Sequence, residues 1–271
     1  MSPGALPIGV FDSGIGGLTV LKALCERLPG EDFLYLGDTA RLPYGTKTAA
    51  TVEKYALQAV YALVRRGVKA VVVACNTASA AALPALAAGN PGLPIIGVIE
   101  PGARAAVAAT RTGRIAVMAT EGTVRGGAYQ REIRRLLPGA QVTAVPATLF
   151  VALAEEGWTE GEVALAAARR YLAPLFTGAD APDVLVLGCT HFPPLAGAIR
   201  AVAGPGVRIV DSAVTTAEAL AGLLAEQGLA SGEVQGVCRF LVTDGEERFA
   251  RVGPVFLGRA IAAREIERIN L

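Results

Sequence analysis

Val71-Val72-Val73-Ala74-Cys75-Asn76-Thr77 is one of two stretches in which a run of apolar residues leads into a cysteine and then into small polar residues. The other is Val184-Leu185-Val186-Leu187-Gly188-Cys189-Thr190-His191, which holds the only histidine of the chain. A strand buried on both faces of a parallel sheet reads as a continuous apolar run, and open α/β sheets bind ligands at the carboxyl ends of their strands. The sequence therefore predicts two thiols that face one cleft.

Short strand-like runs alternate with segments of helical period along the whole chain, a pattern typical of parallel α/β proteins. We expect helices between these strands, one of them over residues 46–65. Thr215 with Glu218 predicts a capped helix start near the C-terminus, and Thr159 with Glu162 predicts another. The expected strands lie near residues 7–11, 32–37, 69–74, 94–99, 114–118, 141–145, 183–188 and 206–210.

A faint internal repeat divides the chain. Residues 8–13 resemble residues 115–120, each cysteine strand follows its opening at a comparable distance, and residues 95–100 resemble 207–211. We therefore predict an α/β protein of two similar lobes, each a parallel-sheet βα domain with flanking helices, with the active site in the cleft between them. The first lobe is expected to span residues 1–99 plus 211–271, and the second residues 100–210.

The composition limits which partners and which cellular compartment we expect. Lysine and arginine total 25 against 24 acidic residues, so no broad charge favours a nucleic acid or an anionic membrane as partner. The apolar stretch 70–88 is interrupted by polar residues and Pro84, which argues against a membrane span. The first residues lack the pattern of an export signal, so we expect a cytoplasmic protein with free thiols and a small neutral or zwitterionic ligand.

Two acid/base groups on opposite sides of a carbon centre can invert it, because one removes a proton from one face while the other returns a proton to the opposite face. Cys75 and Cys189 share matching contexts that favour this use over a structural one, so a racemase is the first hypothesis. The polar residues after each cysteine are expected at helix starts, where the helix dipole favours negative charge. Cys25 and Cys238 lack such surroundings and are expected to be structural.

Other chemistries fit less well. A zinc site would need Cys189, His191, Cys75 and Asp12 together, without a second histidine or a Cys-x-x-Cys pair, and we expect no metal. The glycines after Asp12 invite a dinucleotide-binding reading, but Thr19 stands at the third glycine position and the Asp12 carboxylate would repel a pyrophosphate. Pyridoxal phosphate needs a Schiff-base lysine, and none of the four lysines is well placed. We expect no cofactor.

Four segments together resemble the cofactor-independent aspartate/glutamate racemase superfamily, and within it the glutamate racemases. Their order and spacing agree across nearly the whole chain, including the late stretch 241–244. The segments are Phe11-Asp12-Ser13-Gly14-Ile15-Gly16-Gly17-Leu18, Leu36-Gly37-Asp38-Thr39-Ala40-Arg41-Leu42-Pro43-Tyr44-Gly45, Ala74-Cys75-Asn76-Thr77-Ala78-Ser79, and Leu187-Gly188-Cys189-Thr190-His191-Phe192-Pro193.

The resemblance implies interconversion of L- and D-glutamate for peptidoglycan synthesis, by an enzyme that is expected to be a homodimer. By position, Cys189 would deprotonate the L-enantiomer and Cys75 the D-enantiomer, assisted by Asp12 and His191. Glu155 and Asp38 would be further acidic groups of the site, although Ala152 replaces a common proline and leaves the choice between Glu155 and Glu156 open. The residues that would hold the substrate are Asp12, Ser13, Pro43, Tyr44, Gly45, Asn76, Thr77, Thr120, Thr123, Thr190 and His191.

Three alternatives stay open. A racemase of aspartate or a hydantoin would use the same two thiols. A non-catalytic amino-acid-binding module would need neither of them. A cysteine hydrolase would leave the second thiol unexplained, because one nucleophile suffices.

Overall fold

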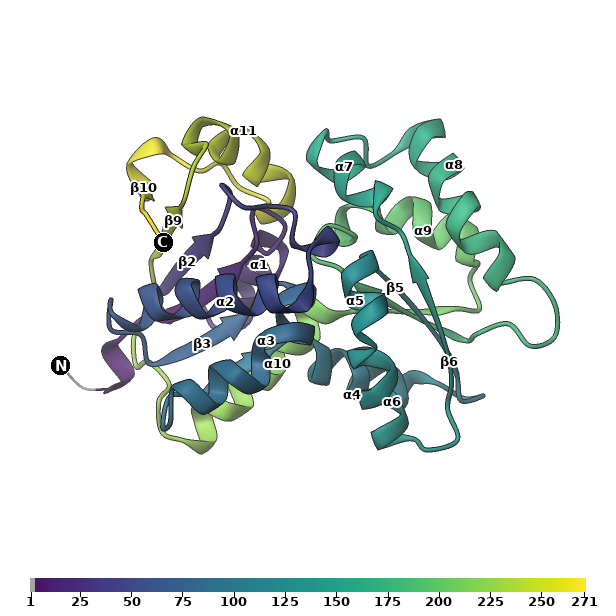
Figure 1. Ribbon diagram of the computed structural model, residues 1–271, viewed down its shortest axis with the longest axis horizontal. Helices are drawn as coiled ribbons and strands as arrows, with labels where there is room; N and C mark the ends of the chain where they lie inside the picture. The colour runs from purple at the N-terminus through teal and green to yellow at the C-terminus, as the bar shows by residue number, and fades with distance from the viewer. Residues whose placement is uncertain (1–2) are drawn as a thin grey trace.

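The computed structural model describes residues 3–271, which form two parallel β-sheets flanked by helices (Figure 1). The six-stranded sheet has the order β10-β9-β2-β1-β3-β4, and the four-stranded sheet has the order β6-β5-β7-β8. Every strand pair in both sheets is parallel. The strands are β1 Ile8–Asp12, β2 Phe33–Gly37, β3 Ala70–Val73, β4 Ile95–Gly97, β5 Arg114–Ala119, β6 Gln141–Pro146, β7 Val184–Gly188, β8 Arg208–Asp211, β9 Cys238–Val242 and β10 Ile266–Arg268.

Helices connect the strands, because consecutive parallel strands need a crossover connection. In Figure 1 the six-stranded sheet and its helices form the half that contains both chain ends, and the four-stranded sheet lies in the other half. We call these halves the first and the second lobe. The helices are α1 Leu18–Arg27, α2 Ala49–Val64, α3 Asn76–Gly89, α4 Ile99–Ala109, α5 Glu121–Gly126, α6 Ala128–Leu136, α7 Leu149–Glu155, α8 Gly161–Leu172, α9 Ala196–Ala203, α10 Ser212–Glu226 and α11 Glu246–Leu257.

The strand orders confirm the internal repeat and the predicted fold class. The first lobe contains the run β2-β1-β3-β4, and the second lobe is β6-β5-β7-β8, so each strand has a counterpart in the same place. The strands that precede the two cysteines, β3 and β7, are fully buried, as are β1 and β2. Their continuous apolar sequences follow from cover by helices on both faces.

The C-terminal segment returns to the first lobe. It adds β9 beside β2, with Cys238 opposite Phe33, and then β10 at the edge of the sheet. β10 was not predicted, because a three-residue edge strand carries little periodic signal. Strands of the first lobe come from residues 8–97 and 238–268 and those of the second from 114–211; the exact lobe boundaries stay a prediction.

Both expected helix caps are wrong. α10 begins at Ser212, because the side chain of Asp211 at the end of β8 accepts a hydrogen bond from the Ala213 amide and caps the helix a turn earlier than Thr215 would. α8 begins at Gly161 after an extended Glu160, without a side-chain cap, so Thr159 lies outside the helix.

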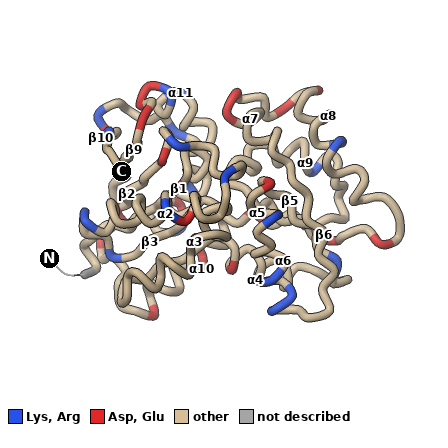
Figure 2. Tube along the Cα trace, viewed as in Figure 1, with Lys and Arg blue, Asp and Glu red and all other residues tan. Residues whose placement is uncertain are grey.

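Charged residues of both signs occur on both lobes (Figure 2), in line with the near-zero net charge. Among the described residues, no helix combines the length and the apolar character needed to cross a bilayer. Within residues 3–271, no group of three or more His, Cys, Asp or Glu side chains is arranged to hold a metal ion.

Candidate active site

A cavity of about 250 Å³ lies between the two lobes, where the carboxyl ends of both sheets meet. The first lobe contributes the loop after β1, the loop after β2 and the start of α3, and the second contributes the residues after β5 and β7 and one face of α7. Both thiols predicted to act together therefore line one small space. The lining residues are Ser13, Leu42, Pro43, Tyr44, Gly45, Thr46, Cys75, Asn76, Thr77, Thr120, Thr148, Val151, Ala152, Glu155, Cys189, Thr190 and His191.

Cys75 sits at the N-cap of α3, as the sequence predicted. Its sulfur accepts a hydrogen bond from the Ala78 amide at 3.4 Å, and only 6% of the residue is exposed. Burial, with a smaller contribution from the nearby Asp12 carboxylate, raises the pKa of Cys75 to about 12. At neutral pH this group is therefore a thiol that can deliver a proton.

Cys189 has different surroundings. The expected helix start is absent here, because a short 3-10 turn at Pro193–Leu195 intervenes and α9 begins only at Ala196. The polar partner of Cys189 is instead His191, whose Nδ1 lies 3.9 Å from the sulfur. The two cysteines are thus matched in position along the chain but differ in their charged neighbours.

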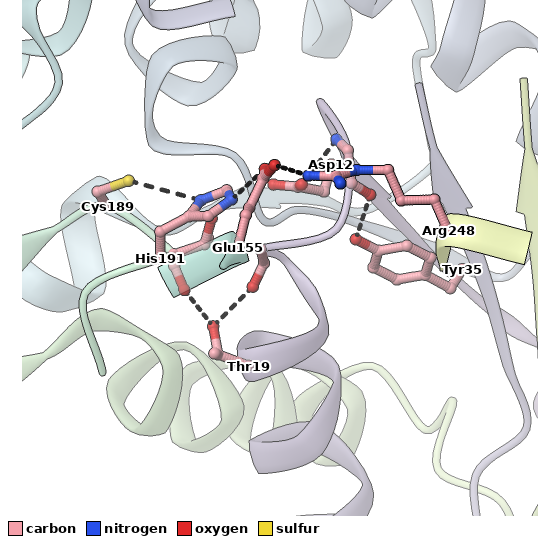
Figure 3. A network of polar contacts seen from close by, with 10 residues as sticks. Asp12, Thr19, Tyr35, Glu155, Cys189, His191 and Arg248 are labelled. Carbon is pink, nitrogen blue, oxygen red and sulfur yellow. Dashed lines mark hydrogen bonds and ion pairs between the residues drawn. The ribbon is translucent and has the colours of Figure 1, made fainter. Parts of the chain in front are cut away.

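A chain of polar contacts runs from Cys189 to the other lobe (Figure 3). His191 Nε2 lies 3.1 Å from Glu155 Oε1, and Arg248 of α11 donates to Glu155 Oε2 at 2.8 Å. Burial lowers the pKa of His191, but its hydrogen bonds with Cys189 and Glu155 outweigh this and raise the pKa to about 10. His191 is therefore protonated at neutral pH and donates from both ring nitrogens.

Glu155, and not Glu156, is the carboxylate at the cavity. Glu155 lines the cavity and contacts His191, whereas Glu156 is exposed. The sequence reasoning missed Arg248, since nothing in its local sequence distinguishes it from other surface arginines. It also missed Thr148, Val151 and Ala152, although their helical spacing from Glu155 places all four on one face of α7.

Asp12 lies at the end of β1 and is completely buried behind the cavity wall. Its Oδ2 accepts a hydrogen bond from the Gly14 amide at 2.8 Å, and burial raises its pKa above the ordinary value. Among the described residues, Asp12 Oδ1 has no hydrogen-bond partner. A buried carboxylate oxygen without a partner is costly, and its pKa shift makes Asp12 a candidate proton carrier next to Cys75.

Asn76 also has an unpaired polar atom. Tyr129 donates to Asn76 Oδ1 at 2.8 Å, which fixes the amide, while Nδ2 has no partner within the described part of the chain. Because Asn76 lines the cavity, this amide group is available to a ligand.

Asp38 does not line the cavity. Its oxygens accept hydrogen bonds from Tyr44, from Arg41 at 2.7 Å and from Thr243 at 3.0 Å. Both oxygens of Asp38 are therefore engaged within the protein. The sequence predicted that Asp38 acts directly in the site, whereas its contacts indicate that it positions Tyr44, which lines the cavity.

Three threonines join the lobes beside the cavity. Thr77 of α3 hydrogen-bonds with Thr120 at 3.0 Å and with Thr123 at 3.1 Å, and Thr120 and Thr123 bond to each other. Thr123 lies behind the lining residues and is 1% exposed. Of these three threonines, Thr77 and Thr120 line the cavity, and Thr123 supports them from behind.

The arrangement suits proton transfer at a carbon centre. One face of the cavity carries the Cys75 thiol near the buried Asp12 carboxyl group, and the other carries the Cys189 sulfur beside the protonated His191 imidazole. The Cys75 thiol can give a proton and a thiolate at Cys189 can take one, and the burial of both residues strengthens electrostatic stabilisation of a developing charge.

Comparisons with known proteins agree with this geometry. A family model described as "Asp/Glu/Hydantoin racemase" matches residues 9–220. A glutamate racemase from Geobacter metallireducens is 50% identical over 252 residues, covering 93% of this chain and 92% of the relative.

Two solved structures are similar along their whole length. Glutamate racemase from Thermus thermophilus, in complex with β-chloro-D-alanine, has a TM-score of 0.88 at 46% identity, covering 99% of this chain and 98% of that one. Glutamate racemase from Francisella tularensis, in complex with D-glutamate, has a TM-score of 0.91 at 36% identity, covering 98% of each chain. With this fold, these paired thiols and this similarity, the chain belongs to the Asp/Glu/Hydantoin racemase family.

Proposed function

We propose that this protein is a glutamate racemase that interconverts L- and D-glutamate by proton transfer between two cysteines at the α-carbon. The observation that carries the proposal is the placement of Cys75 and Cys189, one from each lobe, on the wall of one small cavity. The glutamate racemases similar to this chain over nearly its full length support glutamate as the substrate.

In the direction from L to D, Cys189 removes the α-proton and Cys75 returns one to the opposite face. The high pKa of Cys75 supports this direction for the resting enzyme, because a thiol is the form that donates a proton. After the transfer Cys189 holds the proton, and the site is prepared for D-glutamate. His191 assists Cys189, whose sulfur lies 3.9 Å from its Nδ1, and Asp12 assists Cys75, whose pKa the Asp12 carboxylate helps to raise.

The substrate is held by polar groups in and behind the cavity wall. Asn76 Nδ2 and the hydroxyls of Thr77, Thr120 and Thr190 are suited to carboxylate oxygens, and Ser13, with the adjacent buried Asp12, to the ammonium group. The remaining wall, from Pro43 to Gly45, closes the cavity around the side chain. No cofactor is needed in this scheme, because the protein itself stabilises the carbanion with fixed donors in a water-poor space.

The cellular role that accompanies this activity is the supply of D-glutamate for peptidoglycan, in the cytoplasm. We also propose a homodimer, and lobes that span residues 1–99 plus 211–271 and residues 100–210.

The test is incubation of purified protein with L-glutamate in heavy water without pyridoxal phosphate, following optical rotation and deuterium at the α-carbon. We expect loss of optical activity with solvent deuterium incorporated, and no loss of optical activity in Cys75→Ser or Cys189→Ser. Racemisation retained in the double variant would contradict the two-thiol mechanism.

The same assay separates the alternatives. Exchange with aspartate or a hydantoin but not with glutamate would indicate a related racemase. Glutamate binding without exchange, unchanged when both thiols are replaced by serine, would indicate a binding module.

A further inference from the structure

A second pair of cysteines lies in the first lobe, away from the cavity. The sulfurs of Cys25 and Cys238 are 3.2 Å apart, although the residues are 213 positions apart in the chain. Cys25 belongs to the last turns of α1, and Cys238 is the first residue of β9. Because the cavity lies at the carboxyl ends of the strands, this pair is at the opposite end of the sheet and takes no part in the proposed reaction.

The pair is accessible and has a charged partner. Both cysteines are half-buried and line a surface hollow of about 440 Å³, together with Arg259 and Glu265. The hydrogen bond with Cys25 and the positive charge of Arg259 lower the pKa of Cys238. Glu265 holds the Arg259 guanidinium in place at 3.0 Å. A half-buried thiol that reaches a surface hollow, close to a cation and beside a second thiol, matches the surroundings of redox-active cysteines.

We propose that Cys25 and Cys238 are a redox-active dithiol, which a low-molecular-weight disulfide converts into an intrachain disulfide that fastens the C-terminal segment to α1. The sulfurs need to approach by only about 1 Å to reach a bonded separation. The expectation that these two cysteines are merely structural is replaced by this role.

The chemistry balances as two thiol–disulfide exchanges. The Cys238 thiol loses its proton, and the thiolate attacks one sulfur of the small disulfide, forming a mixed disulfide and releasing one small thiolate. Cys25 then loses its proton and attacks the sulfur of Cys238, releasing the second small thiolate. Each thiolate takes up one of the two protons, so two protein thiols are oxidised and one small disulfide is reduced to two thiols.

The consequence of the bond follows from the topology. β9 and β10 belong to the sheet of the first lobe, but in sequence they follow all the strands of the second lobe. A covalent link across 213 positions restricts the unfolded chain strongly, so the oxidised protein should unfold at a higher temperature than the reduced one.

The experiment oxidises the protein with oxidised glutathione and maps the thiols by mass spectrometry after non-reducing digestion with trypsin. Cys25 falls in peptide 23–27 and Cys238 in peptide 209–239, whereas Cys75 and Cys189 fall in peptides 70–104 and 171–200. We expect peptide 23–27 linked to 209–239, reversed by dithiothreitol, and a rise in Tm of roughly 5–10 °C on oxidation.

Three variants make the result specific. The double variant Cys75→Ser/Cys189→Ser should keep both the crosslink and the rise in Tm, because it leaves only the proposed pair. Cys25→Ser should lose both the crosslink and the rise in Tm. If Cys25→Ser folds poorly, Cys238→Ser provides the same test. Glutathione attached singly to each cysteine, or a crosslink that leaves Tm unchanged or lowers it, would overturn the proposal; neither result bears on the racemase assignment.

Discussion

The substitution Gly16→Ala tests how closely the two lobes are fitted at the active site. Gly16 lies in the loop after β1 of the first lobe, and a Cβ at this position would lie 2.5 Å from Thr190 Oγ1 and closer still to His191 Nδ1 and Cε1. The backbone of Gly16 is not in the left-handed region, so alanine is conformationally acceptable there. Any effect must therefore come from contact with the second lobe.

The size of the effect follows from how firmly His191 is held. Ordinary carbon contacts are about 3.5–4.0 Å, so the added methyl group requires a shift of about 1 Å. His191 packs edge-on against Phe256, with ring centroids 5.2 Å apart, and pairs with Glu155, so the ring cannot turn aside freely. A misplacement of about 1 Å near reacting groups costs about 100-fold in rate, or about 2.7 kcal/mol in barrier height.

The assay is kcat/KM for glutamate by circular dichroism, with thermal unfolding measured in parallel. We expect kcat/KM to fall about 100-fold while the protein remains folded. The matched control is Gly126→Ala, whose Cβ would meet nothing closer than Ala80 Cβ at 3.9 Å. Activity of Gly16→Ala within threefold of the control would refute the reasoning, because the loop would then absorb the methyl group without moving His191.

Three further predictions concern charges. Lys69→Met should lower the free energy of unfolding in urea by about 3–5 kcal/mol, because it leaves the buried Glu31 carboxylate without its cation. Lys22→Met, which removes the exposed pair with Glu26, should lower it by less than about 1 kcal/mol. Equal losses in the two variants would contradict the burial argument. Arg248→Met should change the free energy of unfolding by less than about 1 kcal/mol, because Arg248 is exposed. It should raise KM more than it lowers kcat, because the ion pair with Glu155 connects the lobes across the site, and Arg248→Lys should restore KM. An unchanged KM would show that this ion pair does not contribute to substrate binding. His191 should contribute fully to stability below pH about 6.5, and this contribution should be lost as the pH rises through about 10, because the folded state raises the pKa of His191. Within this range the free energy of unfolding should fall by at most about 1.4 kcal/mol per pH unit, and this dependence should disappear in His191→Asn. The same pH dependence in the wild type and the variant would disprove the prediction.

The sequence predicted the fold class and the cavity through local patterns. The continuous apolar runs before Cys75 and Cys189 identify buried parallel strands, and the carboxyl ends of such strands meet at one edge of a sheet. The repeat then indicated two lobes, and the strand orders confirmed it. These conclusions needed only period and order along the chain, which packing between helices and sheets imposes directly on the sequence.

The distances between side chains that are remote in sequence were decided by the tertiary structure alone. The contact of Arg248 with Glu155, the hydrogen bond from Thr243 to Asp38, and the approach of Cys25 to Cys238 each join elements that no local pattern relates. Hydrophobic periodicity specifies which face of an element is buried but not which polar group it meets, because that depends on how the lobes pack. The sequence by itself therefore determined the two thiols and the sheets that carry them, and the folded chain determined their unequal surroundings.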